Sequence, residues 1–356
     1  MAEQVRIGIV GTSWWADLVH LPNLHGYPRA VLAAICGRSR ERADEMARKY
    51  GIPLVFTDYR AMIETGGLDA VVISVPDDLH YPMVMGALDA RLHILCEKPL
   101  ALNVIQARAM CEKAEAAGVA HMVFYTWRWT PLQHCIRQLL DEGYIGRCYD
   151  CQMVFHGGFA RSGEYGWRYD RQRSNGVWGD LGSHMIDLTR WYVGEIEAVS
   201  AHLTMFTDHP GEDGRPMELS NDSAVAALRF TGGAHGTLNV STVRHIGSRV
   251  MEQRIMLYGE DGTLEGRMTF GEVELYGARK DEPDLHPIPI PDSLWGDSNR
   301  SNALDVFQHQ RIGGRLFVDA ILDGAPASPD FYDGLKAQEV IDAGMKANES
   351  GQWMNL

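Results

Sequence analysis

The chain has 356 residues and a formal net charge of −14, so neither a nucleic acid nor an anionic membrane is expected as a general partner. This length suggests two domains. The N-terminus lacks the basic and apolar regions of a secretory signal, and no apolar stretch reaches the roughly 18 residues of a spanning helix. The six cysteines lack paired metal-site spacing, so we expect reduced cysteines, no metal site and a cytoplasmic protein.

Residues 1–126 alternate apolar runs with segments that are compatible with helices. The expected strands are Val5–Val10, Val31–Cys36, Pro53–Phe56, Leu68–Val75, His93–Cys96 and Val119–Tyr125. The first expected helix follows the first loop and runs to about His25, and the second ends at Tyr50. The other three cover 59–65, which Gly66–Gly67 stops, 81–90 and 103–117. Near-continuous apolar strands suit a parallel sheet that is covered on both faces. The alternation therefore predicts a doubly wound α/β domain of the Rossmann type.

A degenerate dinucleotide-binding loop follows the first expected strand. It runs from Gly11, which supplies the tight turn, to Ala16, which stands where the third glycine usually does. Ser13 replaces the second glycine and adds a hydroxyl donor, and the helix N-terminus behind it favours a phosphate. We therefore expect Gly11, Ser13, Trp14 and Trp15 to contact a dinucleotide cofactor.

The end of the second strand bears on the choice between NAD and NADP. NAD-selective loops usually place an acidic residue there for the ribose 2′-hydroxyl, but this chain has Gly37. Arg38, Ser39 and Arg42 could hold a 2′-phosphate instead, which favours NADP. Alternatively, Arg38 stacks on adenine, Arg42 is a solvated helix charge, and NAD still binds.

Other polar side chains lie beyond later strand ends, where an open parallel sheet binds its ligands. In Glu97-Lys98-Pro99, the proline stiffens the turn, and a lysine in that crevice can move protons. Taken alone, Lys98 could equally be a surface lysine, and His80 either a cofactor contact or an ordinary loop histidine. The expected cofactor contacts here are Ser74, Pro76, Leu79, His80, Glu97, Lys98, Trp127 and Arg128.

After an expected helix at about 132–141, the pattern changes from residue 147 onward to strands that often alternate apolar and polar residues. They run over 147–156, 198–207, 222–230, 236–243, 252–258, 262–268 and 272–276. This favours a second α/β domain, residues 127–356, with a large and mostly antiparallel open sheet. Residues 162–176 form an insertion rich in aromatic residues and arginine, and 280–298 a long surface loop. Closing helices, expected over 302–323 and 331–348, could pack back on the first domain.

Between the first two of these strands lies Asp180-Leu181-Gly182-Ser183-His184. On one helix, Asp180 and His184 would share a face and could serve as binding and acid–base groups. Asp187 could orient His184. The commoner alternative is a buried histidine that a nearby carboxylate satisfies.

Together these segments resemble the Gfo/Idh/MocA family of NAD(P)-dependent oxidoreductases over nearly the whole chain. The resemblance rests on Gly11–Ala16, Pro76–His80, Glu97-Lys98-Pro99, Trp167-Arg168 and Asp180–His184. It implies a Rossmann domain and a C-terminal domain whose sheet often forms an oligomer interface, hence a dimer or tetramer. Lys98 and His184 match family residues implicated in proton transfer, and Asp180 matches one that binds substrate hydroxyls. Ser13 and Gly37 depart from the commonest family pattern.

The leading hypothesis is reversible hydride transfer between nicotinamide and a carbinol carbon of a sugar or cyclic polyol. Its catalytic residues would be His184, Lys98 and Asp180. Trp127, Arg128, Trp167, Arg168 and Arg171 would line the substrate or nicotinamide pocket, and the arginines hint at an anionic group. The alternatives are a redox-neutral glycosidase that uses bound NAD and a non-catalytic dinucleotide sensor.

Overall fold

The strands and helices of the chain fall into two units. The computed structural model describes residues 4–65 and 67–356, so the helix stop expected at Gly66 lies outside the described residues. The first unit contains Met1–Tyr125 and Phe307–Lys336, and the second contains Thr126–Val306 and Ala337–Leu356. Residues 307–336, which the sequence left free to pack on either domain, thus group with the first unit.

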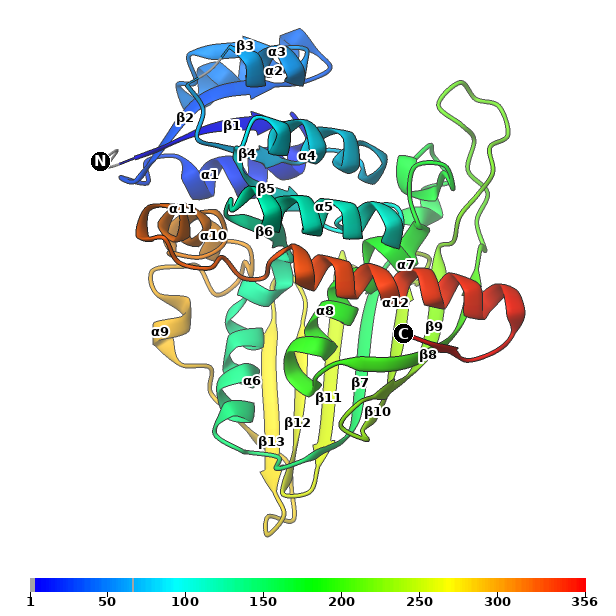
Figure 1. Cartoon of the computed structure of the whole chain (residues 1–356). Coiled ribbons are helices and arrows are strands. Elements are labelled where there is room, and N and C mark those ends of the chain that lie inside the picture. Colours follow the sequence, from blue (N-terminus) through cyan, green and yellow to red (C-terminus); the bar gives the residue numbers. More distant parts are fainter. Residues whose placement is uncertain (1–3, 66) are drawn as a thin grey trace. The chain divides into compact units, whose positions relative to one another are not determined.

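The first unit is built from parallel strands and the helices that connect them (Figure 1). Its strands are β1 (Val5–Val10), β2 (Ala30–Cys36), β3 (Leu54–Phe56), β4 (Ala70–Ile73), β5 (His93–Glu97) and β6 (His121–Phe124). Its helices are α1 (Leu21–Leu24), which continues a π-helical turn (Ala16–His20), α2 (Arg40–Tyr50), α3 (Tyr59–Glu64), α4 (His80–Asp89), α5 (Val104–Ala117), α10 (Val306–His309) and α11 (Gly314–Asp323).

These six strands form one sheet in the order β3-β2-β1-β4-β5-β6, and every pair is parallel. The last residues of β1 and its neighbours lie side by side, with Val10 opposite both Cys36 and Ile73. All carboxyl ends therefore meet at one edge, and the loops that begin with Gly11 and Gly37 leave from it. The order reverses beside β1, which is where such sheets bind ligands. The predicted Rossmann domain is confirmed.

The second unit is dominated by longer strands. They are β7 (Cys148–Gly157), β8 (Ile196–Thr204), β9 (Ser223–Phe230), β10 (His235–Ser241), β11 (Met251–Gly259), β12 (Gly262–Met268), β13 (Val273–Arg279), β14 (His286–Pro287) and β15 (Met354–Asn355). The helices are α6 (Pro131–Asp141), α7 (Gly176–Asp180), α8 (Gly182–Val193) and α9 (Asp292–Trp295), while α12 (Phe331–Ser350) begins in the first unit and continues in the second. Within 4–65 and 67–356, no helix is long and apolar enough to cross a membrane.

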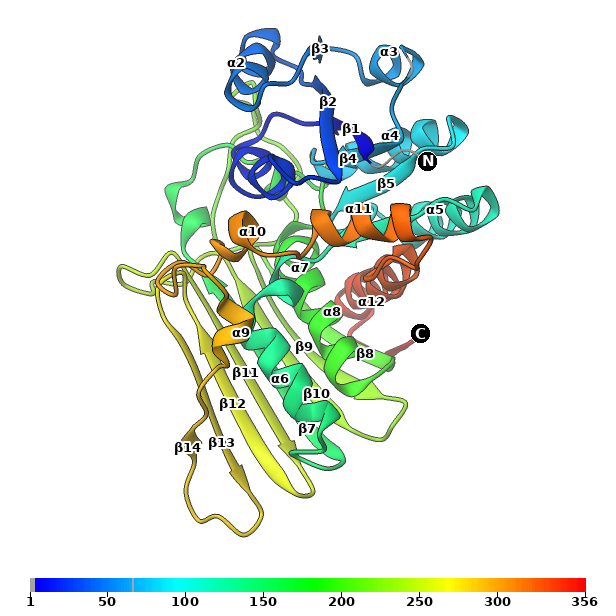
Figure 2. The same cartoon turned by 90° about the vertical axis from the view of Figure 1, so that its left-hand side faces the viewer.

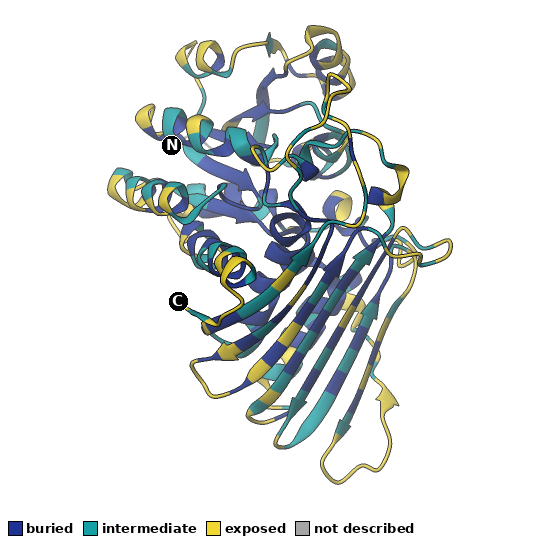
Figure 3. Ribbon diagram, turned by 90° about the vertical axis from the view of Figure 1, so that its right-hand side faces the viewer, coloured by how far each residue is buried: buried dark blue, intermediate teal, exposed yellow. Residues whose placement is uncertain are grey.

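The nine strands form one sheet in the order β14-β13-β12-β11-β7-β10-β9-β8-β15. Only the β7–β10 pair is parallel among the described pairings, which confirms the predicted mostly antiparallel sheet. Cys151, Met153 and Phe155 on β7 are buried at alternate positions, because a strand sends successive side chains to opposite faces. Helices α6 and α8 cover one face (Figure 2). The other face carries mixed exposure without a helix over it (Figure 3).

Two local expectations for the second half were wrong. Residues 280–298 are not a loop without secondary structure, since they contain β14 and α9, and Trp295 is buried. The segment 302–323 is not one continuous helix, because Gly313 separates α10 from α11 with a positive φ of 54°. A Cβ at Gly313 would lie 2.8 Å from the Phe124 ring, so close packing favours glycine there.

Candidate active site

The loop after β1 is held by backbone packing. Gly11 has a φ of 118°, and a Cβ on it would lie 2.0 Å from the carbonyl oxygen of Ser74, so only glycine fits. The Ser13 hydroxyl accepts a hydrogen bond from the Ala16 amide at 3.1 Å, which supports the start of the following helix. Trp14 is largely exposed and packs edge-on against Trp15. This strand, turn and helix start fit a dinucleotide pyrophosphate.

A buried carboxylate ties that helix to the end of β5. Glu97 Oε1 accepts hydrogen bonds from Trp15 Nε1 at 2.8 Å and from His20 Nε2 at 2.7 Å. Burial alone would raise the pKa of Glu97, but these bonds and the charges of His20 and Lys98 outweigh it and hold the pKa below its usual value. Lys98 is half-buried, and its amide donates to Glu97 Oε2 at 3.2 Å. Sequence reasoning missed His20, which stands between the apolar residues Val19 and Leu21.

His80 ties the loop after β4 to the turn after Lys98. It is fully buried, with Nδ1 2.9 Å from the Pro99 carbonyl oxygen and Nε2 3.0 Å from that of Val75. Burial lowers the pKa of His80 below its usual value. Because both ring nitrogens face backbone carbonyls, the geometry favours the structural role of the two that the sequence left open. Ser74 is also buried, and Pro76 and Leu79 flank or form the helical turn before α4.

The end of β2 is crowded by a residue that the sequence did not single out. A Cβ on Gly37 would lie 2.4 Å from Thr12 Cγ2, so Thr12 occupies the space of any larger side chain there. The Arg42 side chain donates from Nε to the Thr12 carbonyl at 2.5 Å. Ser39 caps α2 by accepting from the Arg42 amide at 3.3 Å, and Arg38 is exposed. Close packing with Thr12 therefore explains why glycine, and no acidic residue, ends this strand.

In the second unit, Asp180 and His184 do not lie on one uninterrupted helix, which corrects the expectation from their spacing. Helix α7 ends at Asp180 and α8 begins at Gly182. Leu181 between them has φ −88° and ψ −34°, so the backbone stays in the right-handed helical region across the interruption. A Cβ on Gly182 would lie 3.0 Å from the Trp178 indole, which explains the small residue at the junction.

Asp180 meets a predicted partner from the aromatic insertion. Arg168 Nε lies 3.0 Å from Asp180 Oδ2, and the carboxylate side chain is only 10% exposed. The Arg168 guanidinium also lies 4.4 Å from the centroid of the Trp167 ring. The structure therefore brings three predicted site residues together, a carboxylate, a guanidinium and an indole.

His184 lies in an aromatic environment. It is buried, with ring centroids of Trp127 at 6.1 Å and Phe155 at 6.3 Å, and Trp127 also faces Phe270 at 6.3 Å. Such surroundings exclude water and suit a proton-transfer group that meets its substrate in a dry pocket. Phe155 and Phe270 were missed, although the period-two pattern of β7 already placed Phe155 on the buried face.

Two other predicted arginines are engaged with carboxylates. Arg128 is buried, its Nε lies 3.0 Å from Asp187 Oδ2, and its guanidinium lies 5.2 Å from the Trp191 ring centroid. Arg171 is more exposed and pairs with Glu218 at 3.5 Å and Glu349 at 3.2 Å. Arg128 thus has a structural role within the second unit, whether or not it also touches a ligand, and the orientation of His184 by Asp187 stays a prediction.

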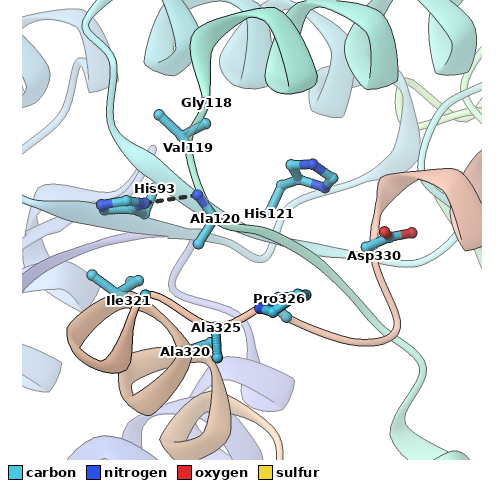
Figure 4. A pocket seen from close by; sticks show the side chains of 12 residues that line it. His93, Gly118, Val119, Ala120, His121, Ala320, Ile321, Ala325, Pro326 and Asp330 are labelled. Atoms are coloured by element: carbon cyan, nitrogen blue, oxygen red, sulfur yellow. Dashed lines mark hydrogen bonds between the residues drawn. The ribbon is translucent and has the colours of Figure 1, made fainter.

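A cavity of about 290 Å³ opens elsewhere, at the amino ends of β5 and β6 (Figure 4). His93 and His121 line it, and His93 Nδ1 accepts from the Ala120 amide at 2.8 Å. None of its described lining residues is a predicted site residue, and it lies at the sheet edge opposite to the one where parallel sheets bind ligands. The part of the chain that the structure describes has no cluster of three or more residues suited to a metal ion.

A parallel sheet with a glycine turn at its switch point, joined to a domain with a buried carboxylate and imidazole, defines a dinucleotide-binding oxidoreductase. Comparison with known families agrees. The model of the oxidoreductase family with an NAD-binding Rossmann fold matches residues 5–125, and the GFO/IDH/MocA C-terminal domain matches residues 134–265. The chain belongs to the Gfo/Idh/MocA family, which confirms the resemblance.

Individual relatives cover nearly the whole chain. A levoglucosan dehydrogenase from Pseudarthrobacter phenanthrenivorans is 26% identical over 92% of this chain and 90% of its own. A scyllo-inositol 2-dehydrogenase (NAD(+)) from Bacillus subtilis is 27% identical over 81% of each chain. A solved oxidoreductase domain protein from Kribbella flavida is 27% identical, with a TM-score of 0.89 over 99% of both chains.

Proposed function

We propose that the protein transfers a hydride between nicotinamide and a carbinol carbon of a sugar, sugar derivative or cyclic polyol. The observation that carries the proposal is a buried imidazole, His184, four residues from a carboxylate, Asp180, in a dinucleotide-binding oxidoreductase. The relatives named as levoglucosan and inositol dehydrogenases act on such carbinols. Their names favour a dehydrogenase over redox-neutral glycoside cleavage.

In this proposal the dinucleotide supplies the hydride chemistry, and the protein supplies position and proton transfer. Oxidation of an alcohol also releases a proton, so a base must lie within about 3 Å of the hydroxyl. His184 is the first candidate for that base and Lys98 the second. Asp180 would accept a hydrogen bond from a neighbouring hydroxyl, while Arg168 holds the carboxylate in place. His184 and Asp180 belong to the second unit, and Lys98 belongs to the first.

The remaining predicted contacts divide between the cofactor and the substrate. Gly11, Ser13, Trp14 and Trp15 would hold the pyrophosphate end, and Arg38, Ser39 and Arg42 the adenosine ribose. We propose NADP over NAD. Gly37 offers no carboxylate for a 2′-hydroxyl, and the exposed Arg38 beside it could bind a 2′-phosphate. Trp127, Arg128, Trp167 and Arg171 would line the nicotinamide and substrate pocket.

The experiment is a turnover assay on sugars and cyclic polyols, including levoglucosan and scyllo-inositol, with NAD and NADP tested separately. His184→Ala and Lys98→Ala should each lower kcat by about 100-fold or more, as expected for loss of a general base. The exposed His286 and Lys280 provide matched controls, whose alanine variants should behave like the wild type. Near-wild-type turnover in both site variants, or tight cofactor binding without turnover of any substrate, would overturn the proposal.

We also propose a cytoplasmic homo-oligomer, a dimer or tetramer that assembles through the open face of the nine-stranded sheet. That face exposes Val225 on β9 and Tyr276 on β13 among its polar residues. Light scattering after size-exclusion chromatography tests it: Val225→Lys combined with Tyr276→Lys should give monomers, and a wild-type monomer would contradict it.

A further inference from the structure

Two segments far apart in sequence pair near Asp180. Residues 159–175 join β7 to α7 and carry Arg168, while residues 205–222 join β8 to β9. The Ser220 amide donates to the Tyr169 carbonyl at 2.8 Å, and the Arg171 amide donates to the Glu218 carbonyl at 3.0 Å. The turn that carries Arg168 is therefore docked on the second segment by backbone bonds on its C-terminal side.

A buried aromatic stack fastens the same turn from the side. The rings of Tyr169 and His209 lie 4.2 Å apart between centroids and 13° from parallel. Both side chains are buried, at 5% and 2% exposure. Burial, and more weakly the charge of Asp180, raises the pKa of Tyr169 to about 12. Tyr169 directly follows Arg168, so whatever fixes Tyr169 also fixes the arginine that pairs with Asp180.

The partners of His209 restrict where its protons lie. Nδ1 is 2.6 Å from the Glu164 carbonyl oxygen, which can only accept, so Nδ1 carries a hydrogen. Nε2 is 2.9 Å from Thr207 Oγ1, and that hydroxyl is 2.7 Å from Asp222 Oδ2. A threonine hydroxyl has one hydrogen to give. If it goes to Asp222, Nε2 must also donate, and the ring is an imidazolium.

In the alternative pattern the direction of these hydrogen bonds is reversed. Thr207 then donates to Nε2, and Asp222 must be protonated so that it can donate to Thr207. The surroundings of Asp222 oppose it, because the amides of Phe206 and Thr207 donate to Oδ2 at 3.0 and 2.9 Å. An oxygen that accepts these bonds is best satisfied as part of a carboxylate. Asp222 is fully buried, and the two amides and the Thr207 hydroxyl supply the hydrogen bonds that a buried carboxylate requires.

We propose that His209 is a positioning residue for the substrate site: as a buried imidazolium between Glu164 and Thr207, stacked on Tyr169, it fixes the turn that holds Arg168 against Asp180. The proposal rests on the proposed function only in assigning Asp180 and Arg168 to substrate recognition. In this proposal His209 acts through Tyr169, on which it stacks.

The protonation state is tested by nitrogen-15 NMR of histidine-labelled protein at neutral pH. The expected result is that both ring nitrogens of His209 carry hydrogen, with the resonance assigned by its disappearance in His209→Phe. A neutral ring with hydrogen on Nδ1 alone would overturn the imidazolium.

The positioning role is tested by variants that leave Asp180 and Arg168 in place. His209→Phe keeps a ring for stacking but loses both hydrogen bonds. Thr207→Val removes the hydroxyl between His209 Nε2 and Asp222 and keeps the bond from Nδ1 to Glu164. We expect His209→Phe to raise KM for the best substrate of the panel about tenfold, which corresponds to about 1.4 kcal/mol. The value of kcat and the cofactor Kd should change less than about twofold. Thr207→Val should act in the same direction and more weakly.

Amide hydrogen exchange gives a readout that does not depend on turnover. Exchange across residues 164–171 should accelerate in His209→Phe and Thr207→Val but not in His286→Phe, a control on an exposed histidine of β14. A lower melting temperature with unchanged KM and unchanged exchange would overturn the positioning role. If His209→Phe does not fold, Thr207→Val decides by the same criteria. If no sugar is turned over, the proposed function fails, while exchange still decides whether His209 fixes the Arg168 turn.

Discussion

The first unit holds its candidate site residues through backbone, whereas the second holds them through pairs of side chains. The Ser74 carbonyl leaves room only for glycine at position 11, and the carbonyls of Pro99 and Val75 hold the two ring nitrogens of His80. In the second unit, Asp180 is paired with Arg168 and Arg128 with Asp187, which lie on different segments. Parallel strands align their carboxyl ends by their register alone, so short motifs suffice there. An antiparallel sheet with long insertions has no such common edge, so distant charged partners must place each group.

The largest expected effect comes from breaking the buried pair of the second unit. Asp187→Ala should cost about 3–5 kcal/mol of unfolding free energy, because the buried Arg128 charge loses its carboxylate. Urea unfolding measures this. Asp141→Ala, which breaks the exposed pair with Arg137, is the control and should cost less than about 1 kcal/mol. Equal effects in the two variants would contradict the view that buried pairs hold this unit.

A second prediction concerns the backbone-held loop of the first unit. Gly11→Ala should cost about 3 kcal/mol and abolish measurable dinucleotide binding, because its φ is 118° and the new Cβ would meet the Ser74 carbonyl. Gly26 also has a positive φ, of 72°, but open space around it, so Gly26→Ala should cost about 1 kcal/mol and leave binding intact. Calorimetric titration with NADP and urea unfolding test both. Wild-type dinucleotide binding by Gly11→Ala would contradict the view that backbone packing holds this loop.

Glu97 differs from the other candidate site residues of the first unit, because side chains, those of Trp15 and His20, hold its carboxylate. Its pKa in the folded protein lies below the ordinary 4.5, so its contribution to stability is present above that value and is lost as the pH falls through the folded pKa. Glu97→Gln should cost about 2 kcal/mol at neutral pH. The cost should shrink as the medium is acidified below the ordinary value. Urea unfolding at neutral and acid pH measures it, and a pH-independent difference would contradict the assignment.

The smallest expected effect lies at the exposed end of the cofactor site. Arg38→Ala should weaken NADP binding about tenfold, or about 1.4 kcal/mol, while NAD binding stays within about twofold. Arg40, also exposed and paired with Asp44 in the next turn, gives the control Arg40→Ala, which should change neither. Equal losses for both dinucleotides would show that Arg38 does not read the 2′-phosphate.

The cavity between β5, β6 and α11 shows that a hollow in the surface does not by itself mark the functional site. It is lined by two histidines, and burial lowers the pKa of both His93 and His121. Yet it lies at the amino edge of a parallel sheet, and the dinucleotide loop lies at the carboxyl edge.

The sequence by itself determined the family, the Rossmann sheet and the mostly antiparallel second sheet, and it predicted the residues of the candidate site. These follow from local signals: apolar periodicity, glycine at a positive φ, and short motifs at strand ends. Only the tertiary structure decided that α7 and α8 break between Asp180 and His184, that Arg168 pairs with Asp180, and that His209 stacks on Tyr169. The two pairings join residues 12 and 40 positions apart. The spacing of residues along the chain does not by itself specify the fold that brings them into contact.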